Sequence, residues 1–469
     1  MALLKGDQMN GSTSRRTGLV GRGPKGLLAV ALLSIAFAWV GEAKAHEEVN
    51  DWNEVMANME PVSGFFMHSR LAALLHVSIH DAINSIPEHA RYETYLPPVK
   101  TSGPANPKAA LAAAGRTILI KHIDFYTDPS LPPHFYKPWL EDIRPEVEDL
   151  YAAQLAVIPN NSAKDEGKRV GRRAAQHIWN LRVDDGWNNP DNIPWVWPND
   201  DGDNDSFTSL PGQYVELPPE KTYPGSPQPA FYWWGFVTPW AMTSNDQFLV
   251  EPPPAYNDPD HIDDIEEVRA YAADNSTVRT EKQENEALWW ETCLGFAGPL
   301  EMARQLLNNT DPNNYKAARI MALMAITQAD AMISNVNSKN YYNFWRPFTA
   351  IEFYHPGGDW NPFLVTPSNQ EYPAGHPMVS GSGFHALAAF FGYDPLPNPI
   401  VGASCGALRT RRSGRRFKES LTAAYGAACT SGTPARWAPK WASKSPRTCA
   451  TTSLESSTTE GCSRRLSAA

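Results

Sequence analysis

Cysteine is scarce over most of this 469-residue chain, because Cys293 is the only cysteine before residue 401 and the other four follow it. One cysteine cannot form a disulfide framework, so none is expected in the first 400 residues. Long apolar runs are also missing. The one extended run, residues 27–40, falls short of the roughly 20 residues that a membrane-spanning helix needs. The composition is otherwise globular, with 42% hydrophobic, 11% aromatic and 20% charged residues, which excludes a disordered or fibrous chain.

Positive charge is scarce in the body of the chain. The net charge of −10 argues against a general nucleic-acid-binding protein, which needs a basic face. Residues 403–469 nevertheless carry 12 Lys and Arg against 3 Asp and Glu, and residues 1–45 carry 6 against 2. The stretch between them, 46–402, is left at −23. We therefore divide the chain into residues 1–45, a body at 46–400 and an atypical basic tail at 401–469.

The first 45 residues have the composition of an export signal. Arg15, Arg16, Arg22 and Lys25 precede the apolar run, and Ala43-Lys44-Ala45 follows it. A basic region, a short apolar core and a small-x-small site are typical of a secretory signal peptide. A membrane anchor is the alternative, but the run is short for one. The expected location is therefore secreted or periplasmic.

Helical periodicity dominates the body. Apolar residues recur at three- and four-residue steps in 69–83, 109–123, 147–181, 266–290 and 315–333. Residues 186–260 are instead rich in Pro, Asn, Asp, Gly and Trp, which predicts a long ordered loop region. Its tryptophans, Trp195, Trp197, Trp233 and Trp234 among them, should be buried. With no strand-like alternation and no internal repeat, the sequence predicts an all-α fold in one large domain.

Asp201, Asp203 and Asp205 are spaced as in a calcium-binding loop. The glycine expected at the sixth loop position and the closing glutamate are both absent. A solvated acidic loop is the better interpretation, so we predict no metal-ligating cluster of side chains here.

Candidate functional side chains are most concentrated in residues 330–391. Lys339 and Arg346 are seven residues apart, which on one helix is two turns and places both side chains on one face. Pro347 would end or kink that helix. A compact lysine ammonium beside a planar, two-pronged arginine guanidinium suits the binding of a tetrahedral oxyanion. A solvated charged face is the alternative, but the neighbouring aromatic residues at 341–345 argue against it.

A second motif, Pro373-Ala374-Gly375-His376-Pro377, precedes a helix-like run at 383–391. A glycine just before a helix lets backbone N–H groups approach an anion, and the positive end of the helix strengthens the attraction. Pro377 suits the first position of a helix. His376 would then exchange protons with whatever the anion binds. A purely structural histidine is the alternative.

Lys339-x6-Arg346-Pro347 followed by Pro373-Ala374-Gly375-His376 resembles the first two signature motifs of the vanadium-dependent haloperoxidase and type 2 phosphatidic acid phosphatase superfamily. Segments at 69–83, 247–256 and 279–290 also look like its soluble haloperoxidase branch, so the resemblance covers about residues 50–395. It implies an all-helical bundle of the haloperoxidase and acid phosphatase type, here with a long Pro- and Trp-rich loop region.

The resemblance also implies a cofactor and roles for the motif residues. The cofactor would be vanadate, whose equatorial oxygens Lys339 and Arg346 would bind, with a backbone N–H from Gly375 and with His376 as the acid–base group. Peroxide and halide would be the substrates, and an organic acceptor is an open addition. Ala374 stands where the family pattern has serine, which removes one hydroxyl donor and leaves the halide preference open.

The third motif of the family, roughly Ser-Arg-x-x-Gly-x-x-His, is absent from residues 396–469. It would supply a second cage arginine and the histidine that bonds vanadium directly. We therefore predict weak or no activity for the chain as encoded.

The genetic code offers an explanation for the missing motif. The third base of each codon from Thr422 onward, joined to the first two bases of the next codon, permits Ser-Arg-Ile-Trp-Gly-Gly-Val-His-Phe-Arg-Asp. That string contains the missing motif with its spacing. Our hypothesis is a frameshift between about residues 392 and 421, and a genuinely divergent tail is the alternative. A soluble acid phosphatase on the same cage and an inactive oxyanion-binding protein remain open as functions.

Overall fold

The computed structural model describes residues 47–59, 65–131, 136–188, 210–218, 221–222, 229–292, 297–310 and 313–391, and the backbone at 401–402 and 406–407. All of these lie in the compact unit Lys44–Ala469. The predicted signal peptide, the aspartates at 201–205, Trp195, Trp197 and nearly all of the basic tail lie outside the described residues. The predictions made for them stay predictions.

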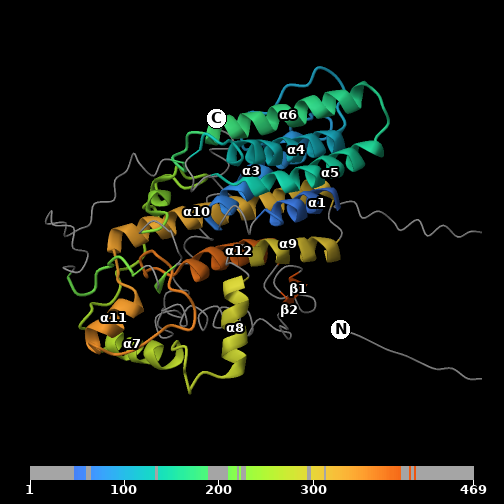
Figure 1. Ribbon diagram of the computed structural model, residues 1–469. Helices are drawn as coiled ribbons and strands as arrows, with labels where there is room; N and C mark the ends of the chain where they lie inside the picture. The colour runs from blue at the N-terminus through green and yellow to red at the C-terminus, as the bar shows by residue number, and fades with distance from the viewer. Residues whose placement is uncertain are drawn as a thin grey trace, which may run out of the picture. The chain divides into compact units, whose positions relative to one another are not determined.

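The all-α prediction is confirmed. Figure 1 shows helices throughout the described part of the chain. The α-helices are α1 (Glu47–Ala57), α3 (Phe65–Asn84), α4 (Pro107–Tyr126), α5 (Arg144–Ala156), α6 (Ser162–Arg182), α7 (Pro259–Tyr271), α8 (Glu281–Thr292), α9 (Ala297–Thr310), α10 (Asn314–Tyr342), α11 (Pro347–Tyr354) and α12 (Gly375–Phe391). Two 3-10 helices are η1 (Pro138–Ile143) and η4 (Tyr232–Phe236). The strands are two-residue segments, β1 (Val401–Gly402) and β2 (Gly406–Ala407), which pair antiparallel.

Helix α10 lies at the centre of the main helical layer and packs against α3, α9, α12 and η4 (Figure 1). Helices α3, α4 and α6 pack against one another. Ile320, Met324 and Ile326 of α10 are buried, as the apolar stripe predicts, and Leu323 is half-buried. Most of α10 is buried all round, which is typical of a helix inside a large core.

Two of the predicted helical stretches are interrupted. Residues 147–181 divide into α5 and α6, because Asn161 caps α6 by accepting a hydrogen bond from the Lys164 amide at 3.0 Å. Residues 266–290 divide into α7 and α8. There the Arg279 guanidinium donates to the carbonyls of Tyr271 and Ala273, at 2.8 and 2.7 Å, and so satisfies groups at the end of α7.

The loop region predicted for residues 186–260 is confirmed where it is described, because its described residues before α7 contain no α-helix and only short 3-10 segments such as η4. Trp233 and Trp234 are buried as expected. Asn340 of α10 donates to the Tyr232 carbonyl at 2.7 Å, so η4 lies against the C-terminal half of α10. This contact brings the loop region to the end of α10 where Lys339 lies.

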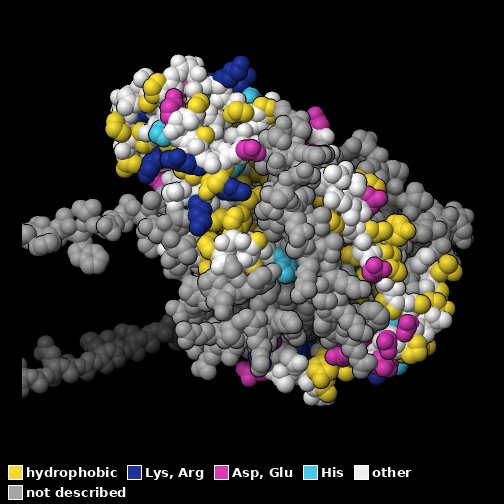
Figure 2. Space-filling view, turned by 180° about the vertical axis from the view of Figure 1, so that it is seen from behind, with side chains coloured by type: hydrophobic (Ala, Val, Ile, Leu, Met, Phe, Trp, Pro, Cys, Tyr) yellow, Lys and Arg dark blue, Asp and Glu magenta, His cyan; other side chains and the backbone are white. Residues whose placement is uncertain are grey.

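A small second hydrophobic cluster joins α7 to α11. Ile265 and Val268 of α7 are buried with Ala350 and Ile351 of α11 and with Trp345. The cluster fixes the chain directly before Arg346. Figure 2 shows Asp and Glu side chains gathered on this part of the molecule, whereas Lys and Arg gather near α4–α6.

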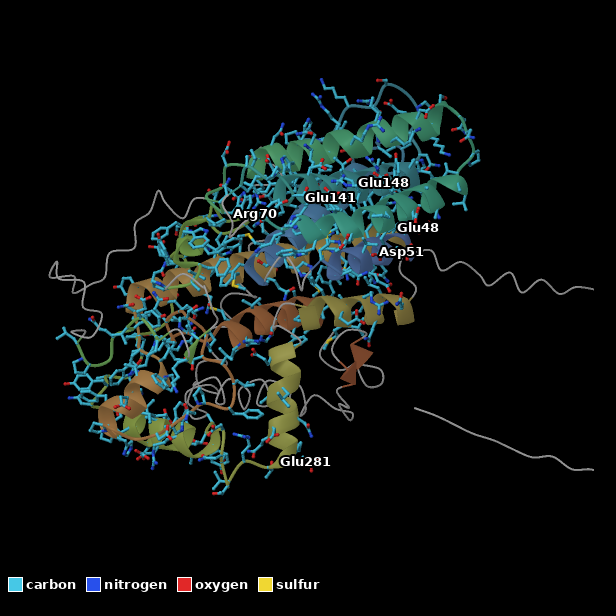
Figure 3. All side chains as sticks on the ribbon, viewed as in Figure 1. Glu48, Asp51, Arg70, Glu141, Glu148 and Glu281 are labelled. Carbon is cyan, nitrogen blue, oxygen red and sulfur yellow. The ribbon has the colours of Figure 1, made fainter. Side chains whose placement is uncertain are left out.

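A buried charge network ties α3 to α6. Arg70, labelled in Figure 3, donates from Nε to Asp185 Oδ2 at 3.2 Å and lies over the Trp187 ring, 4.6 Å from its centroid. Arg182 lies 3.9 Å from the Trp240 ring centroid and donates to the Thr238 carbonyl at 2.7 Å. These cations are therefore held by a carboxylate, aromatic faces and backbone carbonyls.

Candidate functional site

The C-terminal end of α10 presents two polar side chains one turn apart, Asn335 and Lys339. Residues four apart lie on one face of a helix, so both side chains reach the same neighbouring segment. The helix stops at Tyr342. Asn343 then takes a left-handed conformation, with φ 45° and ψ 44°, while its amide still donates to the Lys339 carbonyl at 2.9 Å. Asparagine tolerates this conformation better than most residues with a Cβ.

The prediction that one helix carries Lys339 and Arg346 is wrong. The helix ends four residues before Arg346, which is extended, with φ −81° and ψ 151°, and precedes α11. Pro347 begins α11 instead of ending α10. The reason is steric, because the ring of a proline disfavours helical conformation in the residue before it.

The two cations nevertheless meet at one short segment, residues 369–371. The Lys339 ammonium donates to the carbonyls of Gln370 and Glu371, the latter at 3.0 Å. The Arg346 guanidinium donates from Nε to the Asn369 carbonyl at 2.5 Å and from Nη2 to Asn369 Oδ1 at 2.6 Å. Its Nη1 donates to Glu371 Oε2 at 2.5 Å. The two cations are therefore brought together by their contacts with residues 369–371, and not by a shared helix face as predicted.

All three charged groups are buried: Lys339 is 6% exposed, Arg346 4% and Glu371 5%. Burial lowers the pKa of Lys339 well below its ordinary value, and the nearby Arg346 lowers it further, while Glu371 acts in the opposite direction. When Lys339 is protonated, two cations face one carboxylate and one positive charge is left over. An added anion would offset the cost of burying it.

Within the described residues, both cations keep N–H donors that no hydrogen bond uses. A guanidinium has five N–H groups and an ammonium three. Three on Arg346 and two on Lys339 are used within the described residues. The remaining N–H groups and the excess positive charge suit an oxyanion.

The same segment leads into the N-terminus of α12. Asn335 Nδ2 donates to the Pro373 carbonyl at 3.0 Å, so α10 holds this segment through Asn335 as well as through Lys339. Helix α12 begins at Gly375, which places Pro377 third in the helix instead of first. The opening N–H groups of a helix have no intrahelical partner and attract anions.

Ala374, Gly375 and His376 are all half-buried. A Cβ built on Gly375 would lie 3.5 Å from Asn335 Oδ1, an ordinary contact, so packing against Asn335 does not explain the glycine. Backbone access to a ligand therefore stays the prediction for Gly375, and proton exchange stays the prediction for His376. The structure brings Lys339 and Arg346 together through residues 369–371 and places the other three on the helix that follows.

Three residues of this arrangement are not among the predicted site residues: Asn335, Asn369 and Glu371. Asn335 precedes Lys339 by one helical turn, and this spacing was a usable signal. Glu371 precedes the Tyr-Pro-Ala-Gly-His motif directly, but nothing local in the sequence pairs it with Arg346.

Two properties of the described residues bear on the class of site. No group of three or more His, Cys, Asp or Glu side chains there could hold a metal ion. Within the same residues, no helix combines the length and the apolar character that crossing a bilayer requires.

Comparison with known proteins gives consistent matches. Residues 319–422 match the family model of the second helical-bundle domain of VCPO. Vanadium chloroperoxidase of Curvularia inaequalis is 22% identical over 393 residues, which cover 71% of this chain and 62% of that protein. The chain thus spans less than two thirds of the length of this relative.

Solved structures agree with the fold. A bacterial vanadium-dependent iodoperoxidase has a TM-score of 0.66 at 19% identity, over 87% of this chain and 95% of the other. The holo-type bacterial vanadium-dependent chloroperoxidase has a TM-score of 0.61 at 13% identity, over 90% and 97%. The predicted resemblance to the haloperoxidase superfamily is confirmed, and both motifs fall within the matched residues.

Proposed function

We propose that this chain, with its haloperoxidase fold and VCPO-type second helical bundle, is a vanadate-dependent haloperoxidase-like oxidoreductase. Its substrates would be hydrogen peroxide and a halide. One observation carries the proposal: two buried cations with unused donors meet at the segment that leads into a Gly-His helix N-terminus.

The residues present fit an oxyanion such as vanadate. Lys339 and Arg346 would hold its charged oxygens through their remaining N–H groups, and the Gly375 amide would add a donor at the positive end of α12. When bound, vanadate supplies the Lewis-acid centre that activates peroxide toward a halide. Ala374 adds no hydroxyl.

The chain's own residues would position the anion and manage a proton. Asn335, Asn369 and Glu371 hold the two cations or their segment in place, so the donors need little reorganisation when an anion binds. His376, one residue into α12, would hold or release a proton at its imidazole. His376 is half-buried as a residue, and its Nε2 atom is buried.

The missing third motif limits the activity that we propose for the chain as encoded. Without the second arginine and the directly bonding histidine, vanadate would be held by charge and hydrogen bonds alone. We propose that the tail is a frameshifted reading. Sequencing the coding DNA tests this, because an intact alternative frame without the Ser-Arg-x-x-Gly-x-x-His string would contradict it. Restoring the frame should raise vanadate-dependent halide oxidation.

The same cage suits phosphate, which makes a soluble acid phosphatase the second candidate and an inactive oxyanion-binding protein the third. The purified chain and its frame-restored version should be assayed with and without vanadate. Halide-dependent peroxide consumption that requires vanadate supports the haloperoxidase. Aryl phosphate hydrolysis that vanadate inhibits supports the phosphatase, and anion binding with neither activity supports the third.

We also propose that the first 45 residues direct export and are removed. N-terminal sequencing of protein recovered from the periplasm or the medium should begin near residue 46. Protein retained in the cytoplasm with Met1 intact would contradict export.

A further inference from the structure

We propose that Glu371 determines which oxyanions the Lys339 and Arg346 site accepts, by reducing the positive charge of the site so that singly charged tetrahedral anions are favoured over doubly charged ones. This inference rests on the proposed function, because it assumes that the site binds an oxyanion. It adds a selectivity residue that lies outside both sequence motifs.

The inference rests on the ion pair between Glu371 and Arg346, which is short and buried. Glu371 Oε2 and Arg346 Nη1 are 2.5 Å apart, and the two side chains are 6% and 5% exposed. An exposed ion pair is screened by water and salt, but a buried carboxylate keeps its effect on neighbouring charges. Any anion bound by Arg346 therefore lies within the field of Glu371.

Charge counting gives the direction of the selectivity. An anion bound beside Lys339 favours its protonated form. Lys339 and Arg346 then supply two positive charges, and Glu371 is the one carboxylate among the described residues that pairs with either of them. A singly charged anion would neutralise the remainder, whereas a doubly charged anion would leave one buried negative charge in excess. Uncompensated buried charge is strongly unfavourable.

A bracing role is the competing interpretation of Glu371. On that view the carboxylate merely orients the guanidinium, as Asn369 also does through its carbonyl and its side-chain oxygen. The two roles can be separated because a glutamine at position 371 keeps an oxygen acceptor for Arg346 and removes the charge. Likewise, an aspartate at position 369 keeps its acceptor and adds a charge.

The test compares two probe anions, tungstate and perrhenate, which are both tetrahedral and similar in size but carry two charges and one. Their affinities for the full chain would be measured by calorimetry at pH 8, above the range in which an ordinary histidine titrates. Glu371→Gln should raise the ratio of tungstate to perrhenate affinity about tenfold. Asn369→Asp should lower the ratio by a similar factor.

A matched control is Glu352→Gln on α11, which removes the same charge from an exposed side chain. It should leave the ratio unchanged. Thermal unfolding of each variant checks that it is folded. If Glu371→Gln fails to fold, the Asn369→Asp variant decides between the two roles. Its tungstate-to-perrhenate affinity ratio should stay constant if residue 369 only orients Arg346, and should fall if the added charge acts on the bound anion.

The outcomes separate the two proposals. If the unmodified chain binds neither anion, the oxyanion site itself is wrong and the proposed function falls with it. If the chain binds them but Glu371→Gln leaves the ratio unchanged or lowers it, only the selectivity role of Glu371 is overturned. Opposite shifts in the two variants support it.

Discussion

Two regions of this molecule bury a pair of cations, and they handle the charge differently. In the network between α3 and α6, Asp185 pairs with Arg70 at 3.2 Å and with Arg182 at 3.9 Å. The two guanidiniums thus share one carboxylate, and they donate to the backbone carbonyls of residues 182, 238 and 239. Both guanidiniums also lie over tryptophan rings, which attract cations.

At the end of α10, Lys339 and Arg346 share one carboxylate, Glu371. Neither cation lies over an aromatic ring of the described residues, although aromatic residues surround them in sequence. We call the first network complete, because tryptophan rings face its excess positive charge. We call the second site incomplete, because none of the rings in the described residues faces its cations. The difference teaches that buried cations indicate an anion-binding site when the surrounding groups do not fully stabilise their charge.

The largest effect should come from breaking the complete network. Asp185→Ala leaves Arg70 buried without its carboxylate, and we expect a loss of about 3–5 kcal/mol in the free energy of unfolding. Urea denaturation followed by tryptophan fluorescence measures it. The exposed Asp149→Ala on α5 is the control and should change stability by less than about 0.5 kcal/mol. A loss below about 1 kcal/mol for Asp185→Ala would show that this ion pair stabilises the fold no more than an exposed pair does.

Acid should weaken the helical bundle through buried histidines. Burial lowers the pKa of His76 and of His122 from the ordinary 6.5 to about 3, and the nearby His68 contributes. The unfolded chain then binds more protons between these values, so their contribution to stability is full above pH 6.5 and declines as the pH falls toward 3. The expected loss is on the order of 2 kcal/mol for each histidine by pH 5.

Replacement of one buried histidine tests this pH dependence. His122 packs against Tyr126, with ring centroids 4.6 Å apart, so His122→Phe keeps an aromatic contact there. The variant should reduce the pH dependence of the unfolding free energy by about one proton between pH 4 and 6. The exposed His89→Gln serves as the control. An unchanged slope in His122→Phe would refute the assignment.

Anion affinity at the Lys339 and Arg346 site should depend on the shape of the cationic group at position 346, even when its charge is kept. Arg346→Lys keeps the positive charge but loses the planar fork, so tungstate affinity should fall about tenfold, or ~1.4 kcal/mol. Arg70→Lys makes the same replacement in the complete network and should leave tungstate affinity unchanged while lowering stability. Equal effects of both variants on tungstate affinity would erase the distinction between the two regions.

The smallest effect is expected at the surface of the bundle. Arg116 donates to both carboxylate oxygens of Glu148, which is labelled in Figure 3, at 2.6 and 2.7 Å, but the two side chains are 32% and 41% exposed. A double-mutant cycle with Arg116→Met and Glu148→Gln should give a coupling below about 1 kcal/mol. Coupling above 2 kcal/mol would show that burial is not what separates strong pairs from weak ones here.

Much of the fold could be predicted because helical periodicity is local. The apolar stripe at 320–326 is enough to predict α10, and the Pro- and Trp-rich composition predicts the long loop before α7. The helix breaks were missed, since Asn161 and Arg279 satisfy helix ends through hydrogen bonds that no apolar pattern records.

The site was predicted in part. Lys339 and Arg346 were identified as partners, but for the wrong geometric reason, because the restriction that Pro347 places on the residue before it outweighs the seven-residue spacing. Glu371 and Asn369 were missed because their contacts with Arg346 bridge more than twenty residues. Such contacts depend on how α10 and the segment before α12 pack together.

The sequence by itself determined the helical class, the buried loop tryptophans at 233 and 234, and the two cations beside a Gly-His motif, because periodicity, composition and motif spacing are carried locally along the chain. Only the tertiary structure decided how those cations meet. The segment 369–371 gathers them, and one carboxylate leaves their charge incompletely balanced. The physical reason is that the balance of buried charge depends on which groups share a low-dielectric space, and folding alone brings them together.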